Sequence, residues 1–170
     1  VGREEAKLEA PPAQAKRESV PAVERDRDDI SGVLEQLTEK VDKLLLEVGS
    51  YKVALTNLDK PLWPAENDRG PITKRDMLRY YVGMGPHVLR HVRDRPLTLT
   101  RYPNGIYGQS FYQKRFEQEL PEFAETVRLF SSHNEGDVEY VMINNLATLV
   151  WLAQLADIEL HPWQSRVVAE

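Results

Sequence analysis

The stretch that most constrains the fold is LTNLDKPLWP at residues 55–64, followed after a polar loop by Thr73 and Lys74. Thr73 suits a helix N-cap, and Asp76 three residues later completes a capping box, so a helix is predicted to begin at Lys74. A helix N-terminus offers unpaired backbone N–H groups and a partial positive charge. With Lys60 nearby, this arrangement predicts a compact phosphate pocket. The alternative is an ordinary surface loop with solvated lysines.

The segment before this stretch allows two interpretations. Apolar residues within 30–48 recur at spacings of four and three, which makes a heptad seam of about two and a half repeats. The alternative is a helix over about 30–40 followed by strands at 44–48 and 51–56. The hairpin is favoured, because Gly49-Ser50 between two apolar runs is a hairpin signal.

After Thr73, helical and strand patterns alternate. The helix is expected to run to about Met84, to break at Gly85 and to restart with Pro86 at its first position. The further predicted elements are strands at 96–102, 110–115, 126–131, 138–143 and 158–161, a helical turn at 121–124, a turn at 134–136, and a helix capped by Asn144 or Asn145. Helices mixed with short hairpins predict an α+β fold with a mixed or antiparallel sheet and flanking helices.

Composition narrows the class of protein. The 170 residues suffice for one domain with a hydrophobic core, expected at 31–170, whereas residues 1–30 are mostly small or charged and are expected to be a disordered linker or tail. The absence of cysteine excludes disulfides and cysteine-based zinc sites, and it is compatible with a reducing cytoplasm. No apolar run is long enough to span a bilayer, so no membrane partner is expected.

The net charge of −5 hides an uneven distribution. Residues 51–115 hold 12 Lys and Arg against 5 Asp and Glu, a net charge of +7, whereas residues 116–170 have a net charge of −8. The net positive charge of residues 51–115 is large enough for this block to bind a polyanion. The acidic block is expected to face away from that partner or to face metal.

Several motifs, taken in order, resemble the polymerase domain of bacterial DNA ligase D, a member of the archaeo-eukaryotic primase superfamily that serves non-homologous end joining. Besides the opening stretch, they are RPLTLTRYPNG at 95–105, FYQK at 111–114, LATLVWLA at 146–153 and ELHPW at 159–163. The resemblance covers roughly residues 44–170. It implies the N-terminal part of a primase-polymerase-like fold.

The resemblance assigns a phosphate-binding role to three residues of the opening stretch. Matching residues in the family hold the 5′-phosphate at a DNA break, which implies this role for Asn57, Lys60 and Lys74. Lysine is a compact charge that suits a terminal phosphate. The loop between the two lysines is longer here than in the family.

Other roles follow from the later motifs. The family uses an aromatic pair matching Phe111 and Tyr112 to stack on bases. Neighbouring strand residues point to opposite faces, so one ring is expected in the core and the other exposed, with two core rings as the alternative. The resemblance also implies DNA contacts for Arg101 and Lys114, and places His161 by the phosphates of the incoming nucleotide. A surface arginine and a structural histidine are the alternatives.

A primase-type polymerase needs carboxylates that hold two divalent metals. In the family these form an Asp-x-Asp strand motif beyond the His-Pro-Trp segment, and the present sequence ends at Glu170 before reaching it. The pair Asp157 and Glu159 and the pair Asp137 and Glu139 have the spacing to share a strand face. Both pairs are interpreted as solvated faces, so neither catalytic residues nor metal ligands are expected in this chain.

The resemblance therefore implies binding of DNA 5′-phosphates at breaks or gaps. It also implies templated addition from nucleoside triphosphates with Mn²⁺ or Mg²⁺ in the complete domain, while these 170 residues alone are expected to be inactive. Ligase or nuclease modules and end-joining proteins are further expected partners, in the bacterial cytoplasm at the nucleoid. The alternatives are a stand-alone, non-catalytic DNA-end reader and an oligomerisation element built on the 30–48 seam.

Overall fold

A computed structural model describes residues 30–116, 119–131 and 136–167. In chain order the elements are α1 (Ile30–Gln36), β1 (Leu44–Val48), β2 (Tyr51–Leu55), β3 (Pro61–Trp63), β4 (Ile72–Thr73), α2 (Lys74–Val92), β5 (Leu97–Arg101), β6 (Phe111–Gln113), β7 (Glu125–Ser131), β8 (Gly136–Met142), α3 (Leu146–Gln154) and β9 (Asp157–Pro162). The strand pairs are antiparallel, and the mixture with helices confirms the predicted α+β class.

The predicted tail lies outside the described residues, apart from Ile30, which begins α1. Most of the turn predicted at 134–136 also lies outside them. No helix in the described ranges has the length and apolar character needed to cross a membrane.

The N-terminal hairpin is confirmed. β1 and β2 pair from Leu44 opposite Leu55 to Val48 opposite Tyr51, and Gly49 in the connecting turn adopts a φ of 60°. A positive φ favours glycine, which explains the turn signal. The alternative heptad seam is wrong, because its second half is a strand and Leu37 and Val48 are buried in the core. α1 is also shorter than predicted and ends at Gln36.

α2 begins as predicted but does not break at Gly85. Its capping box is formed, with the Asp76 N–H donating to Thr73 Oγ1 at 3.3 Å and the Thr73 N–H donating to Asp76 Oδ2 at 2.8 Å. The helix continues through Pro86 to Val92. Proline removes one helical hydrogen bond, but buried residues on both sides of it pack against the core and outweigh this loss.

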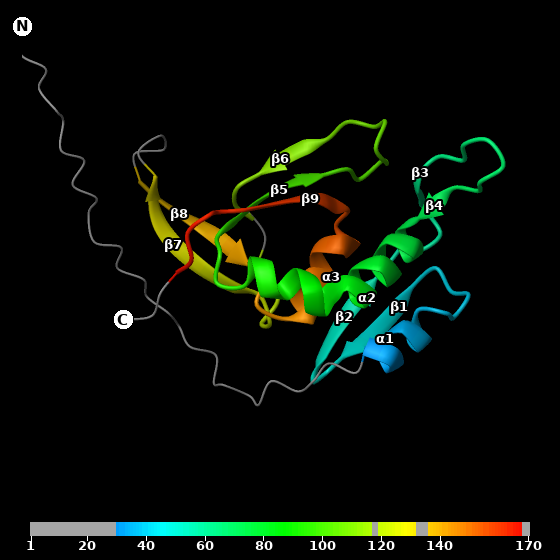
Figure 1. Cartoon of the computed structure of the whole chain (residues 1–170), viewed down its shortest axis with the longest axis horizontal. Helices are drawn as coiled ribbons and strands as arrows, with labels where there is room; N and C mark the ends of the chain where they lie inside the picture. Colours follow the sequence, from blue (N-terminus) through cyan, green and yellow to red (C-terminus); the bar gives the residue numbers. More distant parts are fainter. Residues whose placement is uncertain (1–29, 117–118, 132–135, 168–170) are drawn as a thin grey trace, which may run out of the picture.

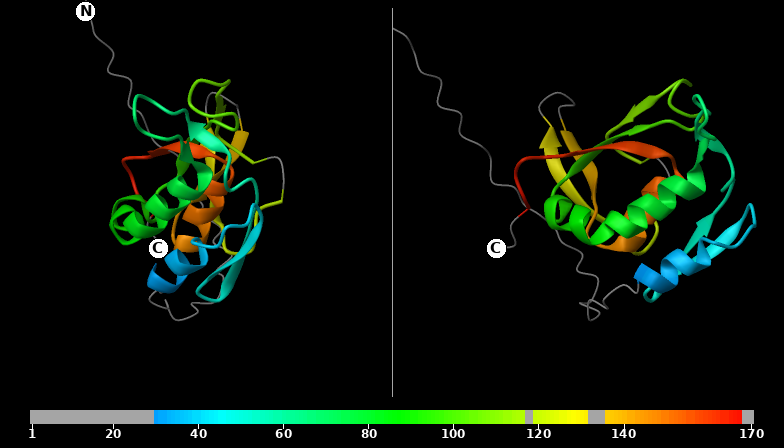
Figure 2. Two further views of the ribbon diagram at one scale, coloured as in Figure 1. Left: turned by 90° about the vertical axis from the view of Figure 1, so that its right-hand side faces the viewer. Right: turned by 45° about the vertical axis from the view of Figure 1, so that its right-hand side comes forward.

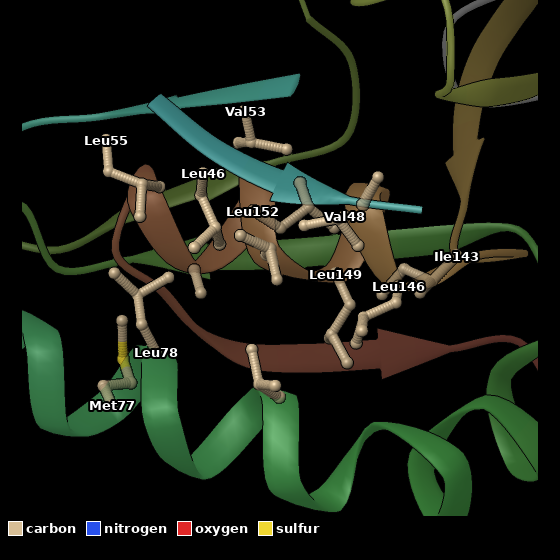
Figure 3. Packing of buried hydrophobic residues seen from close by; sticks show 14 of the residues in the cluster. Leu46, Val48, Val53, Leu55, Met77, Leu78, Ile143, Leu146, Leu149 and Leu152 are labelled. Atoms are coloured by element: carbon tan, nitrogen blue, oxygen red, sulfur yellow. The ribbon is translucent and has the colours of Figure 1, made fainter. Parts of the chain in front are cut away.

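α3 is the centre of the core. Seven of its nine residues are buried, and Figure 3 shows side chains from β1, β2 and α2 gathered around it. Its N-cap is Asn145, whose side chain accepts from the Thr148 N–H at 2.8 Å. Gly85 of α2 lies against α3 so closely that a Cβ there would be 2.7 Å from Leu146 Cδ1.

β3 pairs with β4, and the later strands form a three-stranded sheet, in the order β6-β5-β9, and a separate β7–β8 ribbon. Figures 1 and 2 show this ribbon and the α1–β1–β2 unit at opposite ends of α2. The three-stranded sheet carries most of the residues singled out from the later sequence motifs, so its faces determine which of them meet.

A bulge in β9 separates the two carboxylates that were expected to share a solvated face. Thr100 lies opposite Glu159 and Arg101 opposite Asp157, so β9 advances two residues while β5 advances one. Asp157 is consequently fully buried, whereas Glu159 is exposed. The prediction of a solvated Asp157 is wrong. The side chains of Asp137 and Glu139 on β8 are exposed, as predicted.

Candidate functional site

Lys60 and Lys74 meet because β3 and β4 pair with each other. Pro61 lies opposite Thr73, and the Lys74 N–H donates to the Lys60 carbonyl at 2.9 Å. The intervening residues extend away from the body as the loop between β3 and β4 (Figure 1), so the length of this loop does not separate the two lysines.

The backbone at the start of α2 is already satisfied. Besides the Lys74 N–H, the Arg75 N–H donates to the Leu58 carbonyl at 2.8 Å, and the Asp76 N–H is used by the capping box. The prediction that helix N–H groups are available for a phosphate is therefore wrong for these residues. Any anion held here has to be bound by side chains.

Lys74 is a buried residue, with 6% of its surface exposed. Its Nζ donates to the carbonyls of Thr56 at 3.1 Å and Gln154 at 3.0 Å. A lysine ammonium has three N–H donors, so one has no partner among the described residues. Burial lowers the pKa of Lys74 most, and the charge of Lys60 lowers it further; Asp42 opposes this shift, and Arg101 has the smallest lowering effect.

Lys60 is half-buried and holds the loop that follows β5. Its Nζ donates to the Pro103 carbonyl and, at 3.0 Å, to Asn104 Oδ1. Asn57 begins the turn that leads to Lys60, with a φ of 55°, an exposed side chain and a carbonyl that accepts from the Lys60 N–H at 3.1 Å. The three residues of the predicted phosphate site thus lie within one corner of the fold.

Arg101 completes this group of cations. It is the last residue of β5, and its Nε donates to the Leu155 carbonyl at 3.1 Å. Among the described residues, neither Arg101 nor either lysine forms an ion pair with a carboxylate. We refer to Lys60, Lys74 and Arg101 as the cationic corner.

Asp157 is the buried carboxyl whose charge interacts with that of Arg101. Neither of its carboxylate oxygens has a hydrogen-bond partner within the described part of the chain. Burial raises the pKa of Asp157 to about 7, against the opposing charge of Arg101. At neutral pH the carboxyl therefore neutralises the cationic corner only in part.

The two aromatic residues of β6 are both exposed, Phe111 by 49% and Tyr112 by 61%. The prediction that one ring lies in the core is wrong, because β6 is a three-residue edge strand that pairs only with β5. Phe111 lies opposite Arg101 and Tyr112 opposite Thr100, so the rings belong to different faces of the sheet. Lys114 follows them and is exposed.

His161 belongs to a polar cluster on the sheet face that carries Tyr112. The ring centroids of the two residues lie 6.5 Å apart. His161 Nε2 is 3.1 Å from Glu159 Oε2 and 3.3 Å from Thr100 Oγ1. The Tyr102 hydroxyl donates to the other carboxylate oxygen, Glu159 Oε1.

Sequence reasoning missed Glu159 and Tyr102 as members of this cluster. The signal available was the i, i+2 spacing of Glu159 and His161 on one strand, which places both on one face. The hydrogen bond from Tyr102 is the largest cause that lowers the pKa of Glu159, and the same bond raises the pKa of Tyr102. Within residues 30–116, 119–131 and 136–167, no group of three or more potential ligands is arranged to hold a metal ion.

Comparisons with known proteins agree with the resemblance seen in the motifs. The model of the LigD primase-polymerase domain matches residues 73–170. The multifunctional non-homologous end joining DNA repair protein LigD of Mycobacterium tuberculosis is 37% identical over 119 residues, which cover 70% of this chain and 15% of that protein. LigD of Mycolicibacterium smegmatis is 34% identical over 115 residues, covering 68% of this chain and 14% of that protein.

A solved structure is similar as well. The polymerase domain from Mycobacterium tuberculosis ligase D in complex with DNA superposes with a TM-score of 0.63 at 36% identity, covering 69% of this chain and 39% of that chain. The chain thus spans less than a fifth of the length of the LigD proteins it matches. Because the family model matches more than half of its residues, the chain belongs to the LigD primase-polymerase domain family.

Proposed function

We propose that this chain is the DNA-end-binding part of a LigD-type polymerase domain acting in non-homologous end joining, and that Asn57, Lys60 and Lys74 bind the 5′-phosphate of a DNA break. The observation that carries the proposal is the cationic corner, in which three positive side chains gather without an ion-paired carboxylate among the described residues. The names of the relatives and the DNA bound to the solved domain support the same assignment.

A terminal phosphate fits the charge of this corner. It carries close to two negative charges at neutral pH, whereas an internal phosphodiester carries one. Lys74 offers its remaining N–H from a buried position, where charges interact more strongly than in water. Lys60 can exchange its contact with Asn104 for one with the phosphate, because a charge-assisted bond to phosphate is stronger than a bond to a neutral amide.

The exposed aromatic rings extend the proposed interface. Phe111 and Tyr112 are available to stack on unpaired bases, at about 1–3 kcal/mol per base. The charges of Lys114 and Arg101 suit contacts with the DNA backbone. Because the two rings belong to different faces of the sheet, they serve to separate two strands of a DNA end rather than to stack on neighbouring bases.

Templated nucleotide addition is proposed for the complete domain, with His161 near the nucleotide phosphates and ligase, nuclease or end-joining proteins as further partners. Mn²⁺ or Mg²⁺ would align the attacking hydroxyl and the triphosphate there. The residues described here do not fit such a two-metal site, since none of their acidic and histidine side chains form a group of three or more. The proposed role of this part of the chain is therefore binding and positioning.

Fluorescence anisotropy with two otherwise identical duplexes tests the 5′-phosphate. DNA with a recessed 5′-phosphate should bind about five- to thirtyfold more tightly than DNA with a 5′-hydroxyl, since a solvent-screened contact with a charged group contributes about 1–2 kcal/mol. Lys60→Ala should remove most of this ratio. Arg115→Ala, which changes an exposed residue outside the corner, should weaken the binding of both duplexes alike. Equal affinity of the unmodified protein for the two duplexes would refute the proposal.

A further inference from the structure

The carboxylate of Glu159 contacts the other polar side chains of the exposed cluster on the sheet. One oxygen accepts from the Tyr102 hydroxyl at the end of β5, and the other faces His161 Nε2 at 3.1 Å. Thr100 adds a hydrogen bond to the same carboxylate and lies 3.3 Å from His161 Nε2. The hydrogen bond from Tyr102 lowers the pKa of Glu159 and so favours its ionised form.

The register of the sheet explains why these groups meet. Thr100 lies opposite Glu159, and Thr98 lies opposite His161. Glu159 and His161 therefore project from one face of β9, next to Tyr112, which also lies opposite Thr100. Thr100, Glu159 and His161 lie on paired strands rather than on a loop, so the register of β5 and β9 sets their relative positions.

The contact with Glu159 decides which nitrogen of His161 remains for a ligand. A carboxylate accepts hydrogen bonds, so the His161 nitrogen that faces it carries a proton. Nε2 is consequently committed to Glu159, and Nδ1 is the ring atom left for a second partner. A neutral histidine ring held in this way has one defined orientation and one defined tautomer, and its Nδ1 becomes a donor when the ring takes up a second proton.

We propose that Glu159 is a positioning residue, which fixes the ring of His161 so that Nδ1, once it is protonated, donates its N–H to an anionic ligand such as a triphosphate. This inference rests on the proposed contact of His161 with nucleotide phosphates. It predicts a change in triphosphate affinity whose sign is opposite to the change expected from charge alone. A negative charge near a phosphate site repels the ligand, so the loss of that charge by itself would strengthen binding.

The positioning role predicts the opposite sign. Glu159→Gln retains the shape of the side chain, but its amide has one oxygen instead of two and cannot accept from both Tyr102 and His161 through separate oxygens. Its triphosphate affinity should fall about three- to tenfold, the effect of one lost hydrogen bond of ordinary net strength. The same substitution at Glu139, an exposed carboxylate on β8, is the matched control and should leave the affinity unchanged.

Titration of the protein with magnesium-bound inorganic triphosphate measures the affinity, and the ¹⁵N resonances of the His161 ring report its tautomer independently. We expect a protonated Nε2 in the unmodified protein and a mixture of tautomers in Glu159→Gln. The double variant Glu159→Gln with His161→Ala should bind no more weakly than His161→Ala, because the two residues act through one contact.

The outcomes separate the two proposals. Tighter binding of triphosphate by Glu159→Gln, or an unchanged tautomer of His161, would overturn the positioning role. If His161→Ala binds triphosphate as well as the unmodified protein does, the proposed nucleotide contact fails. The ring resonances would then show only a contact within the protein, so the positioning role would be rejected with it, while the test on 5′-phosphorylated DNA would be unaffected.

Discussion

The buried carboxyl of Asp157 should make the stability of the protein depend on pH. The residue begins β9, is fully buried and has no hydrogen-bond partner for either carboxylate oxygen within the described residues. Burial raises its pKa from 3.8 to about 7. Replacing Asp157 with asparagine removes the charge while keeping the shape of the side chain.

The sign of the effect follows from this shift. An acid with a higher pKa in the folded than in the unfolded chain destabilises the folded state as it ionises, so stability falls as the pH rises from about 4 to about 7. Each unit of pKa corresponds to about 1.4 kcal/mol, so the full cost above that range is about 4 kcal/mol. Between about pH 5 and about pH 8, the free energy of unfolding should fall by about 2.5 kcal/mol from this group alone.

Urea unfolding followed by tryptophan fluorescence measures this difference. At about pH 5, Asp157→Asn should resemble the unmodified protein more closely than at about pH 8, because in the folded state both side chains are then mainly neutral. At about pH 8 the variant should have gained about 2.5 kcal/mol relative to the unmodified protein. Asp137→Asn, which changes an exposed carboxyl on β8, is the matched control. A difference between Asp157→Asn and the unmodified protein that stays constant with pH would refute the reasoning.

The packing of α2 and α3 gives two further predictions, both measured by thermal and urea unfolding. Gly85→Ala should destabilise the fold by about 1–3 kcal/mol, because its Cβ would lie 2.7 Å from Leu146 Cδ1, whereas Gly83→Ala in the same helix meets nothing within 4 Å and should stabilise it by about 0.5–1 kcal/mol. Equal effects at both positions would contradict the close packing. Asn145→Ala should cost about 1–2 kcal/mol through loss of the N-cap bond to the Thr148 N–H, and a neutral result would show that this cap does not stabilise α3.

Local signals predicted the parts of the fold that depend on neighbouring residues. The capping box at Thr73 and Asp76 and the turn at Gly49-Ser50 each involve a few consecutive residues, and both are formed. The antiparallel pairing of β3 with β4 then brings Lys60 and Lys74 together, although the loop between them is long. Local signals and one strand pairing were therefore sufficient to bring the two lysines of the cationic corner together, whereas Arg101 comes from β5.

The predictions that were wrong concern features that depend on packing between distant parts of the chain. The continuation of α2 through Pro86 depends on burial against α3, which no local pattern reveals. The burial of Asp157 depends on a bulge in β9 that appears only when this strand pairs with β5. The exposure of both Phe111 and Tyr112 depends on their place in an edge strand, and strand order is not contained in the alternation of residues along one strand.

The end of β5 joins the two proposed ligand sites. Arg101 belongs to the cationic corner, while the next residue, Tyr102, holds Glu159 on the face that carries His161. The carbonyl of Pro103 and the side chain of Asn104 then bind Lys60. Arg101 is the last residue of β5 and the next three residues follow directly, so four consecutive residues contact both proposed sites. Arg101 of the cationic corner and the carboxylate of Glu159 thus lie on opposite faces of the sheet.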